Sequence, residues 1–174
     1  MLEHHTFEPL IFDDSKVLIL GSFPSIKSFE EGFYYAHPRN QFWPILAQIF
    51  HEEAETKEQK IALCKKHHIA LFDSAKSLQR DKGNSSDTNL KNIEVNDFEA
   101  LLEKYPSIEF IVFTGKKAEE IFNKKYKNLP IKKVVLPSSS PAHASMKFEE
   151  KLQRYKAVFQ EIYSCSLVKV NVPK

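Results

Sequence analysis

Four short apolar runs constrain this chain most, because each ends in small or polar residues and helical segments lie between them. The runs cover residues 16–21, 69–73, 107–115 and 131–136. Short apolar runs stopped by Gly, Asp, Ser or Pro are typical of buried strands. Strands that alternate with helices predict a parallel sheet covered on both faces. We therefore expect an α/β fold, a three-layer sandwich with a central, mainly parallel four-stranded sheet flanked by helices.

Helical periodicity fills most of the chain between these strands, and the remainder is predicted as loop. A polar stretch, residues 79–92, is predicted as loop because Gly, Asn, Ser and Asp dominate it. The chain of 174 residues is expected to form a single domain over 1–174, with a core of about 5–163 and a C-terminal tail over 164–174. The predicted helices are residues 41–51, 56–67, 97–105, 116–126 and 146–163.

Composition excludes few classes of function, but it indicates the cellular compartment and the kinds of partner to expect. A net charge of +2 permits a nucleic-acid partner without requiring one. No apolar run approaches the roughly 18 residues of a membrane span, and the N-terminus lacks a signal-peptide pattern. Cys64 and Cys165 are far apart in the sequence. We expect a cytoplasmic, reduced protein without a membrane partner, acting as a monomer.

The polar residues that follow each strand should converge on one edge, because ligands of open α/β sheets bind outside the carboxyl ends of the strands. The first such segment is residues 21–25, Gly-Ser-Phe-Pro-Ser. Gly21 allows a ligand to approach the backbone closely, and the amides after it can donate hydrogen bonds. Ser25 is expected either to contact a phosphate or to cap a helix. The segment lacks the later Gly and the Lys-Ser pair of a Walker loop, which disfavours phosphoryl transfer.

Residues 32–45 form an unusually polar and aromatic stretch that is poorly suited to core building. Tyr34 and Tyr35 stand close to a strand end, where an aromatic ring can stack on a base. One of the two is expected only to pack in the core with its hydroxyl satisfied. The stretch predicts the floor of a site that takes a nucleobase.

Asn40 is the ambiguous member of this stretch. It stands just before a predicted helix, where an N-cap belongs. Alternatively, its amide points into the pocket, where the carbonyl oxygen can orient a water and the NH₂ group can donate to a carbonyl. The spacing leaves both interpretations open.

A third segment follows the last strand. Residues 136–143 hold three serines between two prolines and end in a histidine, which predicts a stiff, donor-rich loop able to press on a sugar-phosphate backbone. Asp87, in the polar stretch 79–92, is the preferred carboxylate candidate. No histidine has zinc spacing with a cysteine, so no metal site is expected.

Residues 21–25, 33–43 and 136–141 together resemble the uracil-DNA glycosylase superfamily, and most closely its DNA-deoxyinosine (hypoxanthine-DNA) glycosylase branch. The resemblance runs over nearly the whole chain, from His5 to about Tyr163. It implies a uracil-DNA glycosylase-like fold and a monofunctional DNA repair glycosylase without cofactors. Such an enzyme hydrolyses the bond between a deaminated base and deoxyribose in DNA.

The resemblance also implies roles for individual residues. Phe23 stands where most of the superfamily has a water-positioning Asp or Asn, and in the hypoxanthine branch the essential polar residue maps onto Asn40. Tyr35 would stack on the flipped base, and Leu136 replaces the usual leading residue of the wedge loop. These departures favour deoxyinosine as substrate. Asn40 is therefore the expected catalytic residue; base contacts are expected from Gly21, Ser22, Phe23, Tyr35 and His37, and DNA contacts from Ser25, Arg39, Pro137, Ser138, Ser139, Ser140, Pro141 and His143.

Three other functions compatible with the same motifs stay open. The first is a uracil or thymine mismatch DNA glycosylase. The second is a catalytically silent DNA-binding homologue, which Phe23 makes plausible. The third is an α/β hydrolase of free nucleosides, which would need no DNA.

Overall fold

A four-stranded parallel sheet forms the middle layer of the computed structural model, which describes residues 2–80, 90–143 and 145–165. Its strands lie in the order β3-β2-β6-β7, and every neighbouring pair is parallel. This confirms the predicted α/β sandwich, and each strand lies within or coincides with a predicted run. The strands are β2 (Val17–Gly21), β3 (Ile69–Asp73), β6 (Phe110–Thr114) and β7 (Lys132–Leu136).

The two central strands are buried along their whole length, which explains why they read as continuous apolar runs. The register pairs Gly21 with Asp73 at the carboxyl ends of β2 and β3. On the other side of β2, Leu20 pairs with Phe113, so that Thr114 ends β6 beside Gly21. The sheet therefore brings a glycine, a carboxyl group and a hydroxyl group together at one edge.

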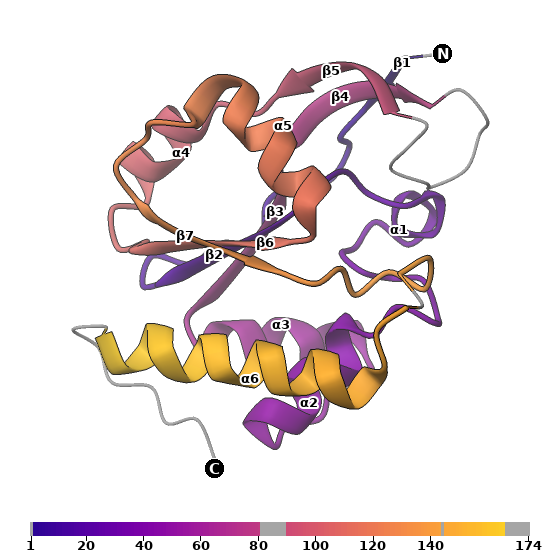
Figure 1. Cartoon of the computed structure of the whole chain (residues 1–174), viewed down its shortest axis with the longest axis vertical. Helices are drawn as coiled ribbons and strands as arrows, with labels where there is room; N and C mark the ends of the chain where they lie inside the picture. The colour runs from indigo at the N-terminus through magenta and orange to yellow at the C-terminus, as the bar shows by residue number, and fades with distance from the viewer. Residues whose placement is uncertain (1, 81–89, 144, 166–174) are drawn as a thin grey trace.

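Helices cover both faces of the sheet (Figure 1). On one face, α2 (Phe42–Phe50), α3 (Lys57–Lys66) and α6 (Phe148–Cys165) pack over one hydrophobic cluster. On the other face, α4 (Phe98–Lys104) and α5 (Lys116–Tyr126) pack over a second cluster. The side chains of Thr56 and Asp97 cap α3 and α4. No helix among the described residues has the length and apolar character needed to cross a bilayer.

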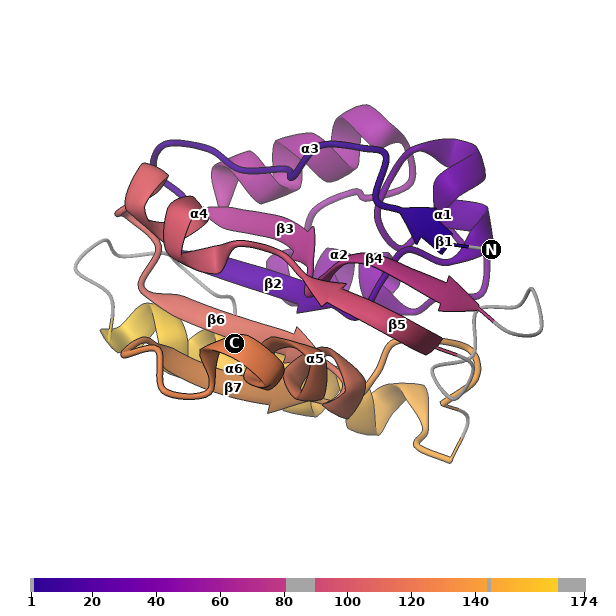
Figure 2. The same cartoon turned by 90° about the horizontal axis from the view of Figure 1, so that it is seen from above.

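A second, antiparallel sheet lies beside the sandwich and was not predicted (Figure 2). Its strands β1 (Leu2–His4), β4 (Ala75–Arg80) and β5 (Leu90–Val95) lie in the order β1-β4-β5. The predicted loop 79–92 is wrong at both of its ends, because Gln79 pairs with Lys91. The strands escaped prediction because β4 is mostly polar and has register shifts. Residues 81–89, including Asp87, lie outside the described residues.

Two further differences concern helices. A short helix, α1 (Ile26–Glu31), was not predicted; Ser25 caps its start and Gly32, with a φ of 65°, ends it. At the other end of the chain, α6 continues to Cys165, so the first two residues of the predicted tail are helical. Helix α1 is the next element after β2, so the short segment 22–25 at the end of β2 leads straight into it.

Candidate active site

A pocket of about 290 Å³ opens at the carboxyl ends of the parallel strands. Its size lies near the lower end of ligand pockets, at about 300 Å³, and suits a single base. Segments that are far apart in the sequence form its wall. This is expected for an α/β fold, because ligands of open sheets bind outside the carboxyl ends of the strands. The lining residues are Phe7, Gly21, Ser22, Phe23, Pro24, Ser25, Ser28, Tyr34, Tyr35, Asn40, Asp73, Thr114, Ser138, Ser139, Ser140, Ala142 and His143.

Gly21 marks the floor of the pocket, and three polar side chains surround it. A Cβ atom at Gly21 would lie 2.7 Å from Asp73 Oδ1, 3.4 Å from the Tyr35 hydroxyl and 3.7 Å from Thr114 Oγ1. Real Cβ atoms do not approach as closely as 2.7 Å. Glycine is therefore required here for the close approach of these side chains.

Asp73 was not singled out as a site residue by the sequence, although it ends a predicted strand. Its Oδ2 lies 2.9 Å from Nε2 of His5, and both side chains are almost fully buried. His5 follows β1 and reaches Asp73 across 68 positions of sequence. No local pattern could have revealed this pair.

The two tyrosines of the polar-aromatic stretch have different surroundings. The Tyr34 ring is buried, and its hydroxyl donates to the carbonyl oxygen of Glu8. The Tyr35 ring stacks on Phe42 with 3.9 Å between ring centroids, and its hydroxyl lies 2.9 Å from Thr114 Oγ1. Burial, followed by the neighbouring Asp73 carboxyl, raises the pKa of Tyr35 well above its usual value. Its phenol therefore stays protonated and able to donate.

Asn40 lines the pocket and also holds the start of α2. Its Oδ1 accepts a hydrogen bond of 2.9 Å from the backbone N–H of Phe42. Because only the oxygen of the amide can accept this hydrogen bond, the contact fixes which way the Asn40 amide points. Nδ2 has no hydrogen-bond partner among the described residues. The predicted N-cap is wrong by one residue, because Gln41 holds that position in α2. Asn40 still contacts the helix start through one lone pair, and its other polar groups can face the pocket.

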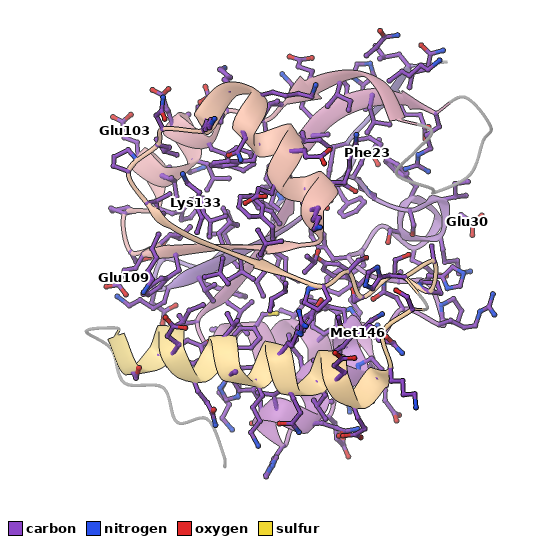
Figure 3. All side chains as sticks on the ribbon, viewed as in Figure 1. Phe23, Glu30, Glu103, Glu109, Lys133 and Met146 are labelled. Atoms are coloured by element: carbon purple, nitrogen blue, oxygen red, sulfur yellow. The ribbon has the colours of Figure 1, made fainter. Side chains whose placement is uncertain are left out.

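Phe23 belongs to the loop after β2, and its side chain, labelled in Figure 3, packs against a cluster that includes Ala75 and Leu78 of the second sheet. It packs near Ile121 of α5 and lies 5.4 Å from the ring of Phe29. The Arg80 guanidinium lies 5.4 Å from the Phe23 ring and donates to the carbonyl oxygen of Pro24. Arg80 therefore holds the loop of residues 21–25 in place, although Arg80 itself falls in the predicted loop 79–92.

The serine-proline loop borders the pocket from the side of β7. Ser138 approaches Gly115 so closely that a Cβ at Gly115 would be 3.4 Å from the Ser138 Cβ. Two side chains of α6 hold the ends of the loop. Tyr155 donates a hydrogen bond of 2.5 Å to the Pro137 carbonyl, and Lys151 Nζ donates one of 2.9 Å to the His143 carbonyl. Burial lowers the pKa of Lys151.

Of the fourteen predicted site residues, ten line the pocket and four do not. Arg39 is exposed, and its backbone N–H donates to Nδ1 of His37. Ser25 lines the pocket, and its hydroxyl also accepts from the N–H of Ser28 as an N-cap. Among the described residues, no group of three or more His, Cys, Asp or Glu could hold a metal ion. The predicted residues away from the pocket wall are His37, Arg39, Pro137 and Pro141.

Comparison with known proteins links this chain to one family. The family described as the Uracil DNA glycosylase superfamily matches residues 9–163. A hypoxanthine DNA glycosylase of Methanosarcina acetivorans is 31% identical over 156 residues, which cover 88% of this chain and 96% of the relative. A hypoxanthine DNA glycosylase of Methanosarcina barkeri is 35% identical over 116 residues, which cover 66% of this chain and 72% of the relative.

One solved structure extends the similarity to the fold. The solution NMR structure of a candidate uracil DNA glycosylase from Methanosarcina acetivorans superposes with a TM-score of 0.78. It is 31% identical in sequence, and the match covers 93% of this chain and 99% of that one.

Proposed function

Because this chain belongs to the Uracil DNA glycosylase superfamily, we propose that it is a DNA glycosylase that removes deaminated bases, above all hypoxanthine, from DNA. One observation carries the proposal: Asn40, Tyr35 and the serine loop 138–140 border one base-sized pocket at the carboxyl ends of the strands. Two relatives bear the name hypoxanthine DNA glycosylase, which supports the choice of base.

The substrate nucleotide must leave the duplex before it reaches this pocket. Rotating a base out costs a few kcal/mol, least for a mispaired base such as hypoxanthine opposite thymine. The serine loop is suited to press on the strand, because side chains of α6 hold it at both ends. Its hydroxyl groups and backbone amides can donate to phosphate oxygens.

Tyr35 is the proposed stacking platform for the flipped base. Phe42 covers one face of its ring, and the ring borders the pocket. Its hydroxyl is tied to Thr114, so the ring is preorganised. Stacking of a base on an aromatic side chain contributes about 1–3 kcal/mol.

Asn40 is the proposed catalytic residue. In the reaction, a water oxygen bonds to C1′ of the sugar while the bond from C1′ to the base nitrogen breaks and its electron pair leaves with the base. The water gives up one proton, the departing base takes up one proton, and the products are an abasic site and the free base. The second lone pair of Oδ1 can orient this water, and the Nδ2 hydrogens can donate to the departing base; both are compatible with the Phe42 contact.

A substrate panel tests the proposal. Duplexes that carry deoxyinosine, deoxyxanthosine or deoxyuridine are incubated with the protein, and abasic sites are measured by alkaline strand cleavage. Excision is expected fastest from deoxyinosine. Asn40→Ala should lower the single-turnover rate by about 100- to 1,000-fold, the usual loss of one transition-state donor.

Three outcomes would contradict the proposal in different ways. Binding of DNA without any abasic product indicates a silent homologue. Release of hypoxanthine from free deoxyinosine, but not from DNA, indicates a nucleoside hydrolase. Full activity of a folded Asn40→Ala variant removes Asn40 from the chemistry. If Asn40→Ala also loses its folded state, its contact with Phe42 is mainly structural.

Uracil is the second candidate base. The name of the matched family contains uracil, and so does the name of the solved relative. A deoxyuridine rate that exceeds the deoxyinosine rate in the same panel would favour this candidate.

A further inference from the structure

The two edges of the four-stranded sheet end differently. At one edge, β3 is buried in four of its five residues, and Leu10 and Leu71 exchange backbone hydrogen bonds of 3.0 and 2.8 Å across it. At the other edge, β7 pairs with β6 alone among the described residues, and only Leu136 of its five residues is buried. Figure 1 looks onto this open edge, where β7 crosses the front of the view between α5 and α6. The peptide groups on the outer side of β7 are therefore available to an added strand.

Lysines flank β7 on the face that α5 covers. Lys133, labelled in Figure 3, donates from Nζ to the Lys127 carbonyl oxygen over 3.1 Å and lies 5.9 Å from the centre of the Phe122 ring. Lys127 itself is exposed. No Asp or Glu occurs in the sequence between Glu120 and Glu149, so this whole segment carries only positive charge.

The other face of the strand is also positively charged. Nζ of Lys132 lies 5.7 Å from the centre of the Phe110 ring and 3.7 Å from a carboxylate oxygen of Glu161. Both members of this ion pair are more than half exposed, so it neutralises little of the charge that a partner would meet. Further along the strand, Val135 is 38% exposed. The edge thus presents positive charge at its start and an apolar side chain near its end.

We propose that the open edge of β7 binds an extended, acidic segment of a partner protein, which adds to the sheet as a further strand. The backbone of this segment exchanges hydrogen bonds with β7, and its acidic side chains lie beside Lys127, Lys132 and Lys133. An apolar side chain of the segment lies beside Val135. A peptide strand supplies both the donors and the acceptors that a strand edge requires, whereas the phosphate oxygens of DNA only accept. The lysines lie near the start of β7, and the pocket opens at the carboxyl ends of the strands, so the surface is distinct from the proposed active site.

Two other occupants of the edge are disfavoured by topology and by charge. Helix α5 connects β6 to β7, and α6 follows β7 on the opposite face of the sheet. A strand that followed α6 and paired with β7 would therefore give a crossover of the opposite hand to β6-α5-β7, and crossovers between parallel strands nearly all share one hand. Lysine on an edge strand disfavours pairing with the same edge of a second copy.

Synthetic peptides test the strand addition on the full chain. The probe is a fluorescein-labelled peptide, Glu-Glu-Asp-Val-Ile-Val-Thr, and fluorescence anisotropy should give a dissociation constant below about 1 mM. The peptide with lysine in place of its three acidic residues should bind more weakly by about tenfold or more, because like charges then meet. N-methylation of its Val-Ile-Val segment keeps the charge and the side chains but removes the backbone donors. This change should also weaken binding by about tenfold or more.

Charge reversal locates the binding surface. The double variant Lys127→Glu with Lys133→Glu should lower the affinity for the acidic peptide by about tenfold or more, since two attractive contacts become repulsive. The matched control combines Lys57→Glu and Lys65→Glu, which make the same change in net charge at exposed positions of α3. Because α3 lies beside β3 at the other edge, the control should stay within about threefold of the wild-type affinity (Figure 2). Thermal melting confirms that both variants are folded.

Several results would overturn the inference. They are no binding of the acidic peptide at about 1 mM, equal binding of the N-methylated peptide, and equal losses of affinity in the two double variants. A loss of affinity for undamaged duplex DNA that is larger in the Lys127→Glu and Lys133→Glu variant than in the control would assign the surface to DNA instead. A dimer in sedimentation that the peptide dissociates would assign the edge to a second copy. Slow hydrogen exchange of every β7 amide in the free monomer would show that the chain itself covers the edge.

Discussion

The floor and the rim of the pocket are built in different ways. The floor is formed by Gly21, Asp73 and Thr114, which end three neighbouring strands of a buried parallel sheet. The rim is formed by the serine-proline loop, which depends on hydrogen bonds from α6. The floor is therefore positioned by the same packing that stabilises the fold, whereas a few side chains position the rim. Changes at the floor should affect chemistry and stability together, whereas the loss of activity caused by a change at the rim need not follow its loss of stability.

The largest effect is expected at the floor. Gly21→Ala places a Cβ 2.7 Å from Asp73 Oδ1, and His5 restrains Asp73 from moving away. We expect single-turnover excision of hypoxanthine to fall by about 100-fold, as for a misplacement of about 1 Å. Overpacking should lower the free energy of unfolding by about 1–3 kcal/mol, measured by urea titration.

Gly32→Ala is the matched control for that change. Gly32 has a φ of 65°, and a Cβ there meets nothing within 4 Å. The variant should lose about 1–3 kcal/mol through backbone strain but keep its excision rate. Equal losses of rate in both variants would show that stability alone limits activity.

A smaller effect is expected from the rim anchor Lys151. Lys151→Met removes the hydrogen bond to the His143 carbonyl but fills the same buried space. Activity should fall by about tenfold, since the loop loses an anchor of roughly 1.4 kcal/mol. The free energy of unfolding should not fall. Burial lowers the pKa of Lys151, which means that keeping its ammonium group charged in the folded protein costs free energy, and methionine removes this cost. If Lys151→Met lowered the melting temperature and the activity together, the proposed difference between floor and rim would be contradicted.

Two tyrosines of α6 make similar hydrogen bonds, one at the rim and one far from the pocket. Tyr155 donates to the Pro137 carbonyl at the rim, and Tyr163 donates to the His67 carbonyl far from the pocket. Replacing either with Phe should cost about 0.5–1.5 kcal/mol of unfolding free energy. Only Tyr155→Phe should slow excision, by about threefold. Equal rates in the two variants would show that the Pro137 contact does not position the loop.

The smallest effect is expected at Arg39, which is exposed outside the pocket wall. If Arg39 contacts a phosphate, Arg39→Gln should reduce the slope of log K against log salt by about 0.9 for duplex DNA. The excision rate at saturating protein should stay the same. Arg154→Gln, on the exposed side of α6 beside Glu150, is the control and should leave the slope unchanged.

Much of the sandwich was predictable because its signals are local. The runs that became β2 and β3 are apolar and end in Gly21 and Asp73, and the structure gives β3 the predicted bounds. The second sheet was not predictable. Its strand β4 carries Lys76 and Gln79 between buried residues, and its pairing with β1 joins segments more than 70 positions apart.

The site was predictable to a similar extent. The aromatic, amide and serine residues that line the pocket belong to compact motifs, so Tyr35, Asn40 and Ser138 could be named in advance. Asn40 lines the pocket as predicted, but it precedes the N-cap of α2, which is Gln41, by one residue. The carboxylate candidate of the sequence, Asp87, lies outside the described residues and stays a prediction, and the described pocket holds Asp73.

Local patterns in the sequence set the alternation of strands and helices, the edge at which polar segments gather, and the residue types in those segments, because all three follow from periodicity and strand ends. Which side chains meet in the pocket depends instead on how the whole chain folds. Register places Asp73 beside Gly21, and the fold returns His5 to Asp73 across 68 positions. Such contacts depend on the packing of the whole chain, since a hydrogen bond between distant residues leaves no periodic trace in the sequence.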